Sequence, residues 1–388
     1  MILELHVLQN VAPNNLNRDD TGAPKDCIFG GTRRSRVSSQ SWKRAMRDRF
    51  KAEGMISVEH QAVRSKRMFG EIADRLVALG HEREVSTNAA RVMLGGLGLS
   101  ANTKDESKTQ YLLFLGEGEI ANLAQYAHEH WDVFQKAGDP SLSGRERKKA
   151  EREAVDSATR KDLLEQLDGG RAADLALFGR MLADLPERNV DGSAQVAHAI
   201  STNTIATEFD FYTAVDDLKP EDTEGADMLG NIEYVSSTLY RYANLDVREL
   251  SRNLQSDTDL VRVTTRAFAD AFVRSLPSGK QNSFAAHNMP SLVVAVVRER
   301  GRWSLANAFV QPVQPWGKDD LMHRSVAALD DYWTRLTGMY GTDGVVATPT
   351  LVDGAYEAQA ASFGAPEPNL SAWLDAIQAC LDRERATS

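Results

Sequence analysis

The hydrophobic period of this chain changes within its first fifty residues, and that change most constrains the fold. Residues 2–9 alternate apolar and polar side chains, which is the period of a half-buried β-strand. Further on, apolar side chains recur at the spacing of one helix face, at Trp42, Ala45, Met46 and Phe50. Ser38 or Ser39 is available as the N-cap of that helix. A strand and an amphipathic helix in this order favour a mixed α+β fold.

The rest of the chain continues the strand and helix pattern around a long helical insertion. Residues 10–37 contain several glycines and prolines and predict a long ordered loop. Helices are predicted near residues 58–80, 84–94, 118–137, 145–167, 171–184, 246–276, 318–338 and at the C-terminal end. Extended segments are predicted at 195–218 (an arm or hairpin), 234–247, 291–301 and 344–352, with a loop at 354–368. Without the insertion this order is compatible with the split βαβ plan of ferredoxin-like and RRM-like domains.

Positive charge is concentrated near the N-terminus of an acidic chain. The 388 residues carry a formal net charge of -10, yet residues 17–51 contain ten basic and four acidic side chains. Such segregation lets one face attract a polyanion while the remainder repels it. Gln40, Lys43 and Arg47 share one face of the predicted helix near its N-terminus, which indicates a phosphate site. The alternative is a solvated helix face that binds nothing.

Three other residue patterns bear on catalytic or cofactor chemistry. The sequence HEH at 128–130 places two histidines on different sides of a helix, which does not favour a metal site. The glycines of residues 94–104 match neither common phosphate-loop pattern. The adjacent Asp19 and Asp20 could bind Mg²⁺ for RNA cleavage, or could orient their own loop through hydrogen bonds. We expect no cofactor and no bound metal.

The cysteines and the apolar segments bear on location. Cys27 and Cys380 give neither a disulfide framework nor a metal-site spacing, which favours a reducing compartment. We see no signal-peptide pattern and no uninterrupted apolar run long enough to span a bilayer. We therefore expect a cytoplasmic protein without a membrane partner.

Several blocks of the sequence resemble one known family. The longest, LNRDDTGAPKDCIFGGTRRSRVSSQSWKRAMR at residues 16–47, closely resembles the N-terminal signature of CasC-type (Cas-seven family) backbone subunits of the type I-E CRISPR surveillance complex, Cascade. Further matches in family order are FGRM at 178–181, AHAISTNTIATEFDFYTAVDDL at 197–218, LYRYANLD at 239–246 and GKQNSFAAHN at 279–288. The helical insertion is the least similar part.

The resemblance implies an architecture shaped like a hand. It would comprise an RRM-like or ferredoxin-like palm, a helical insertion called the fingers and a β-hairpin called the thumb. Mapped onto this sequence, the first part of the palm is residues 1–54, the fingers are 55–185, the thumb is 186–230, and 231–388 form the second part of the palm with the C-terminal elements.

The resemblance also implies roles for particular residues. Those that grip RNA phosphates would be Arg18, Lys25, Ser38, Gln40, Lys43, Arg47 and Lys280, with Arg33, Arg34 and Arg44 as further candidates. Tyr212 and Val215 of the thumb would displace a base, and Met181 would face that base. The alternatives are that Met181 belongs to the core at a helix end and that Tyr212 only packs the hairpin. Arg33, Arg34 and Arg36 could contact RNA or brace a neighbouring subunit.

Function follows as an expectation of the same resemblance. Copies of the chain would polymerise along a CRISPR RNA, grip its phosphates and displace bases periodically, so that the guide pairs with a target DNA strand in antiviral defence. Its other partners would be subunits of the CasA, CasB, CasD and CasE types. Phosphate contacts hold a guide without selecting its sequence. This role does not require catalysis, so it is that of a non-catalytic scaffold. The competing hypothesis is a metal-dependent endoribonuclease that uses Asp19 or Asp20.

Overall fold

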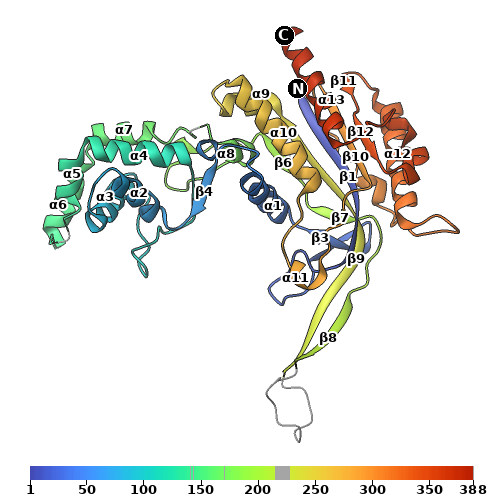
Figure 1. Cartoon of the computed structure of the whole chain (residues 1–388), viewed down its shortest axis with the longest axis horizontal. Coiled ribbons are helices and arrows are strands. Elements are labelled where there is room, and N and C mark those ends of the chain that lie inside the picture. Colours follow the sequence, from blue (N-terminus) through green and yellow to red (C-terminus); the bar gives the residue numbers. More distant parts are fainter. Residues whose placement is uncertain (140, 143, 170, 215–227, 388) are drawn as a thin grey trace, which may run out of the picture. The chain divides into compact units, whose positions relative to one another are not determined.

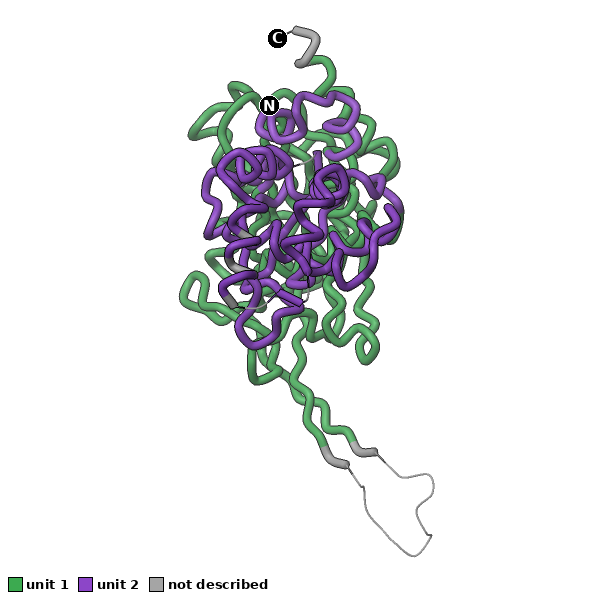
Figure 2. The backbone as a smooth tube through the Cα atoms, turned by 90° about the vertical axis from the view of Figure 1, so that its left-hand side faces the viewer, with its two compact units in different colours: residues 1–53, 195–247, 265–388 green, residues 54–194, 248–264 purple. Residues whose placement is uncertain are grey.

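The computed structural model describes residues 1–139, 141–142, 144–169, 171–214 and 228–387, and the chain divides into two compact units (Figure 2). Unit 1 comprises residues 1–53, 195–247 and 265–388, and unit 2 comprises residues 54–194 and 248–264. Residues 186–194 and 248–264, which the sequence assigned to the thumb and the palm, group with unit 2.

Unit 1 is built on an antiparallel sheet with the strand order β11-β10-β1-β9-β7-β3-β2 (Figure 1). These strands are β1 (Ile2–Asn14), β2 (Asp26–Phe29), β3 (Thr32–Val37), β7 (Ala199–Ser201), β9 (Met228–Asp246), β10 (Leu292–Arg298) and β11 (Val345–Ala347). Beside them, β12 (Thr350–Val352) pairs with β10, while β6 (Ala194–Val196) and β8 (Glu208–Ala214) pair with β9. The expected α+β fold is confirmed.

Helices cover both faces of this sheet. On one face, Leu8, Tyr240 and Val294 share a buried core with α12 (Leu321–Tyr340) and the 3-10 segments η3 (Ala306–Phe309) and η4 (Gly354–Phe363). On the other face, the Arg241 guanidinium lies 3.9 Å from the ring centroid of Trp42 on α1 (Ser39–Ala52) and 4.7 Å from that of Phe272 on α10 (Thr258–Arg274). The central strand β1 is therefore buried on both sides.

The helix α1 begins where the hydrophobic period predicts it. Ser38 is the N-cap, and its hydroxyl accepts a hydrogen bond from the Ser41 N–H at 3.4 Å. Trp42, Met46 and Phe50 are buried, which fixes the phase of the helix against the sheet. The opposite side of α1 is left to its polar and basic residues.

The loop expected over residues 10–37 is wrong at both ends. The strand β1 extends to Asn14, and β2 and β3 form a hairpin in which Phe29 lies opposite Thr32. Gly30 and Gly31 make the turn with φ values of 58° and 77°, which favour glycine. The hairpin escaped prediction because its strands carry three arginines instead of an apolar alternation.

The strands β8 and β9 form an arm that extends from the sheet (Figure 1). Glu208 lies opposite Tyr234, and the pairing continues to Ala214 opposite Met228. The other end of β9 pairs with β1 inside the sheet, so the arm is continuous with unit 1. The extended arm predicted at 195–218 is confirmed for β8, whereas β7 belongs to the sheet. Val215 lies outside the described residues.

Unit 2 is mainly helical, with one two-stranded sheet. Its elements are η1 (Val58–His60), β4 (Ala62–Ser65), α2 (Met68–Ala78), α3 (Arg83–Gly96), β5 (Leu113–Gly116), α4 (Glu117–Glu129), α5 (Trp131–Ala137), α6 (Gly144–Ala154), α7 (Ser157–Glu165), α8 (Ala173–Phe178), η2 (Pro186–Arg188) and α9 (Val247–Asn253). The predicted helix at 58–80 contains a strand, β4, at its start. The predicted helix at 145–167 is two helices, because Asp156 caps α7 and accepts from the Ala158 and Thr159 N–H groups.

The remaining elements are α11 (Gln281–Phe284) and α13 (Leu370–Thr387), and the predicted loop at 354–368 contains η4. Within the described part of the chain, no helix combines the length and apolar character needed to cross a membrane.

Candidate nucleic-acid interface

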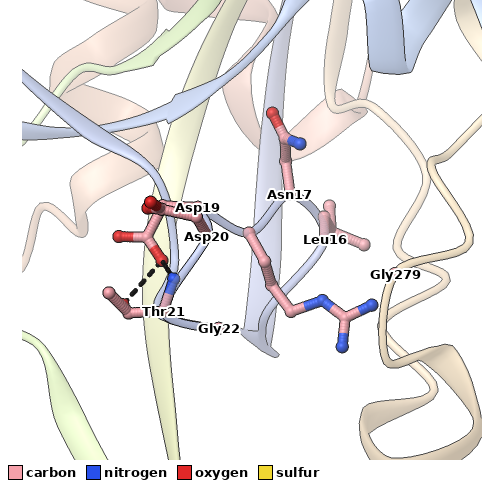
Figure 3. Close-up of a pocket in the computed structure, with 8 residues that line it drawn as sticks. Leu16, Asn17, Asp19, Asp20, Thr21, Gly22 and Gly279 are labelled. Carbon is pink, nitrogen blue, oxygen red and sulfur yellow. Dashed lines mark hydrogen bonds between the residues drawn. The ribbon is translucent and has the colours of Figure 1, made fainter.

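An open groove of about 520 Å³ lies along the loop that follows β1 (Figure 3). It is lined by residues 16–22 and by Gly279 from a distant segment. Asn17 anchors the loop, because its carbonyl accepts from the Lys25 N–H at 2.8 Å and its side-chain oxygen accepts from the Ser38 N–H at 2.8 Å. The groove loop is thereby tied to the first residue before α1. No pattern in the sequence indicated this role of Asn17.

The Asp19 carboxylate holds the turn of this loop. Its Oδ1 accepts from the Thr21 hydroxyl at 2.7 Å and from the Thr21 N–H at 2.9 Å (Figure 3). It also accepts from the Ala23 N–H at 3.0 Å. These hydrogen bonds, the Thr21 hydroxyl foremost, keep the pKa of Asp19 below its ordinary value. Asp20 is exposed. Asp19 thus makes the contacts of a loop-orienting residue.

The basic residues of α1 follow Ser38, the residue to which this loop is tied. Gln40 and Arg44 are exposed, while Lys43 and Arg47 are half-buried. Burial lowers the pKa of the Lys43 ammonium, so an anion placed beside it would favour its charged form. Ser38 is buried and its hydroxyl oxygen accepts one hydrogen bond as the N-cap, while its hydroxyl proton remains the group that can donate to a phosphate.

A second segment reaches the groove through a close backbone contact. A Cβ atom at position 279 would lie 2.9 Å from the Asn15 carbonyl oxygen and closer still to the Leu16 carbonyl, so only glycine fits there. Lys280 follows directly, with a left-handed φ of 53°. Gly279 therefore brings Lys280 beside the loop that carries the exposed Arg18.

The arginines of the β2–β3 hairpin are used differently. The structure contradicts an RNA contact of Arg34, because its side chain is fully buried. Its guanidinium donates to the carbonyl oxygens of Ser201 and Thr202, each at 2.9 Å, and of Phe309 at 2.8 Å. A phosphate has no access to these donors.

The other two hairpin arginines are partly engaged inside unit 1. Arg33 is exposed and forms an ion pair with Asp26. Arg36 donates to the Asp26 carbonyl oxygen at 3.0 Å and lies 3.0 Å from Nδ1 of His198. Burial, followed by the positive charges of Arg36 and Lys25, lowers the pKa of His198. An exposed histidine beside these cations was not singled out from the sequence.

The arm presents aromatic side chains. Tyr212 is 38% exposed on β8, opposite Gly230 of β9, while Phe209 and Phe211 are exposed at alternate positions. Asn15 connects the base of the arm to the groove, because its Nδ2 donates to the Glu233 carbonyl at 2.9 Å and to the Gly22 carbonyl at 3.0 Å. The groove loop and the arm thus share one buried amide.

In unit 2, Met181 is 80% exposed, so the core interpretation of this residue is wrong. Its neighbour Arg180 is buried and donates through Nη1 to both carboxylate oxygens of Glu119, at 2.8 and 2.7 Å. The Arg180 backbone also exchanges two hydrogen bonds of 2.9 Å with Val190. A rigid support therefore presents an apolar side chain to solvent.

Two of the histidines of unit 2 form a pair that the sequence did not indicate. His128 lies 2.7 Å, Nδ1 to Nε2, from His81 and not beside His130. The His81 ring also stacks on Trp131 with centroids 3.6 Å apart. Over the described residues, no group of three or more His, Cys, Asp or Glu side chains is arranged to hold a metal ion.

The fold and the groove together define an α+β protein with an open groove, lined by Arg18 and flanked by Lys280, beside the loop that follows β1 of its antiparallel sheet. Comparison with family models then matches residues 3–376 to the CT1975-like protein family, and the chain belongs to that family.

Solved structures agree with this assignment. The chain is similar to one from a "CRISPR RNA-guided surveillance complex, pre-nicking", with 33% identity, a TM-score of 0.82, and coverage of 98% of this chain and 99% of that one. It is also similar to a chain from a "CRISPR RNA-guided surveillance complex", with 27% identity, a TM-score of 0.74 and the same coverage. A search of curated proteins finds no match.

Proposed function

We propose that this protein is a CRISPR RNA-binding backbone subunit of a surveillance complex and acts as a non-catalytic scaffold in the cytoplasm. The similarity to a surveillance-complex chain over 98% of this one is the observation that carries the proposal. A physical reason comes from Arg18 in the groove, from Lys280 directly after the groove-lining Gly279, and from α1, whose N-cap Ser38 is bonded to the groove loop and whose sequence adds further cations.

The chemistry of the groove, of α1 and of Lys280 suits a guide whose sequence varies. Arg18, Lys43, Arg47 and Lys280 bring positive charge, while Gln40 brings an amide. Such groups bind phosphate and sugar oxygens, which carry no sequence information, and leave base edges free to pair. Lys25 and the exposed Arg44 extend the same set, with Arg33 as a further candidate at the hairpin.

The finer architecture belongs to the same proposal. Unit 1 would be an RRM-like palm, because the order β10-β1-β9-β7, with α1 after β1 and α10 after β9, follows the split βαβ plan. The arm would be the thumb and the helices of unit 2 the fingers. Tyr212 and Met181, both exposed, would contact a displaced base, and Val215 is assigned to this step by sequence alone.

The assembly would be of type I-E. Copies of the chain would line up along the guide, with subunits of the CasA, CasB, CasD and CasE types, and the presented guide segments would pair with target DNA. Displacing a base costs a few kcal/mol of unstacking, about as much as one or two stacking contacts return.

Co-purification tests this proposal. The chain expressed with its partner subunits and a CRISPR array should carry a discrete RNA of guide length, and Lys43→Ala with Arg47→Ala should reduce the RNA-to-protein ratio. Asp48→Ala, on the same helix, is the matched control and should retain the RNA. A complex that assembles without RNA would contradict the proposal.

A further inference from the structure

Gly230 occupies a position in the arm where its backbone conformation does not require glycine. It lies within β9, opposite Tyr212 of β8, and it is not among the residues with a positive φ. Glycine weakens a strand interior, because it loses more backbone entropy on folding than other residues and has no side chain to pack. Another requirement must therefore explain its presence.

That requirement is space for the Tyr212 ring. A Cβ atom at position 230 would overlap Cζ, Oη and Cε1 of Tyr212, at separations that real Cβ atoms do not adopt. The ring therefore lies across the β9 backbone at Gly230, as aromatic rings do when they cover a cross-strand glycine. Tyr212 nevertheless stays 38% exposed, so part of the ring remains open to solvent.

We infer that Gly230 is the positioning residue that lays Tyr212 down as a flat platform for stacking one nucleobase. This inference rests on the proposed function, because it names how Tyr212 would meet the displaced base. A ring supported on one side by backbone is held in one orientation, which suits stacking, and every base has a π-face to offer. The neighbouring Phe209 and Phe211 point to the other face of the arm, as alternate residues of a strand do, and have no such glycine opposite.

Photocrosslinking of the assembled complex tests the inference. Guides with 4-thiouridine at each position in turn would be bound by complexes of the wild-type chain, Gly230→Ala, Tyr212→Ala or Asn231→Ala, and crosslinked residues mapped by mass spectrometry. We expect the wild type and Asn231→Ala to crosslink at Tyr212 at regularly spaced guide positions. Compared at equal amounts of bound RNA, Gly230→Ala should lose that crosslink, down to the background of Tyr212→Ala.

Hydrogen exchange of the β8 and β9 amides separates ring placement from strand formation. These amides should be protected equally in Gly230→Ala and the wild type. Loss of protection in the variant would show that Gly230 serves the strand and would overturn the inference, as would a Gly230→Ala complex that crosslinks at Tyr212 like the wild type. A wild-type complex that retains RNA without any crosslink at Tyr212 would refute base contact by Tyr212 in the proposed function, and this inference with it.

Discussion

Two regions of unit 1 carry similar clusters of positive charge and use them in opposite ways. In the β2–β3 hairpin, Arg34 is buried against main-chain carbonyl groups and Arg33 is paired with Asp26. In the groove loop and α1, Arg18 and Arg44 are exposed. Charge clustering in a sequence therefore locates a functional region but does not say which cations face a ligand.

A similar contrast between a buried and an exposed side chain is found at two consecutive residues of unit 2. Arg180 is buried and satisfied by Glu119, whereas Met181 is 80% exposed. In each case a buried arginine fixes the backbone from which another side chain is presented. Substitutions at paired positions can separate these structural and ligand-facing roles.

The largest expected effect is that of Arg180→Ala. Glu119 would be left buried without its partner, which costs about 3–5 kcal/mol of the free energy of unfolding. Denaturant titration of the full chain measures this loss. The control is Met181→Ala, which should change the stability by less than about 0.5 kcal/mol, because an exposed side chain loses little on truncation. Equal losses for both variants would break the comparison.

Arg34→Ala should come next, with a loss of about 3 kcal/mol, because several buried carbonyl groups lose a charged donor. Urea unfolding checks this value. Arg33→Ala, which removes an exposed ion pair, should cost less than about 1 kcal/mol. If Arg34→Ala instead left the stability intact and only weakened RNA binding, the internal role of Arg34 would be refuted.

Arg18→Ala should weaken guide RNA binding about tenfold, equivalent to about 1.4 kcal/mol, while leaving the thermal midpoint of the chain unchanged. Filter binding at one fixed salt concentration measures the affinity. Thr21→Ala in the same loop is a poor control because its hydroxyl holds Asp19, so the exposed Asp20→Ala serves instead. Unchanged affinity in Arg18→Ala would remove this residue from the interface.

The smallest expected effect is on the pH dependence of stability, through His198 beside the β2–β3 hairpin. The folded pKa of His198 is lowered, so the unfolded chain binds more protons as the pH falls through about 6.5. The contribution of His198 to stability is therefore present at neutral pH and is lost toward acid. Stability measured between about pH 7.5 and 5.5 should fall less steeply in His198→Asn than in the wild type. Parallel curves would contradict this assignment.

Helix α1 could be predicted from sequence because its apolar period is regular and its N-cap serine precedes it. Trp42, Met46 and Phe50 are buried as the spacing requires. The β2–β3 hairpin could not be recognised in the same way, because its only local signal is the turn glycines Gly30 and Gly31. Arginine-rich strands conceal the alternation that marks a half-buried sheet.

The burial of individual side chains at the site could not be predicted from the sequence. Arg34 has the same side chain as Arg18, and only the carbonyl groups brought near it by the fold show its role. The contacts of Asn17 with Ser38, of Asn15 with Glu233 and of Gly279 with Leu16 likewise join segments that are far apart in the sequence. No local pattern encodes such pairings.

The salt dependence of guide binding tests the central claim most directly. The claim is that the groove and α1 bind phosphates without regard to sequence. A plot of the logarithm of affinity against the logarithm of salt concentration has a negative slope. Its magnitude should decrease by about 0.7 for each of Lys43→Ala and Arg47→Ala, and equally for two unrelated guides. A slope that is unchanged, or a loss of affinity confined to one guide, would contradict the claim.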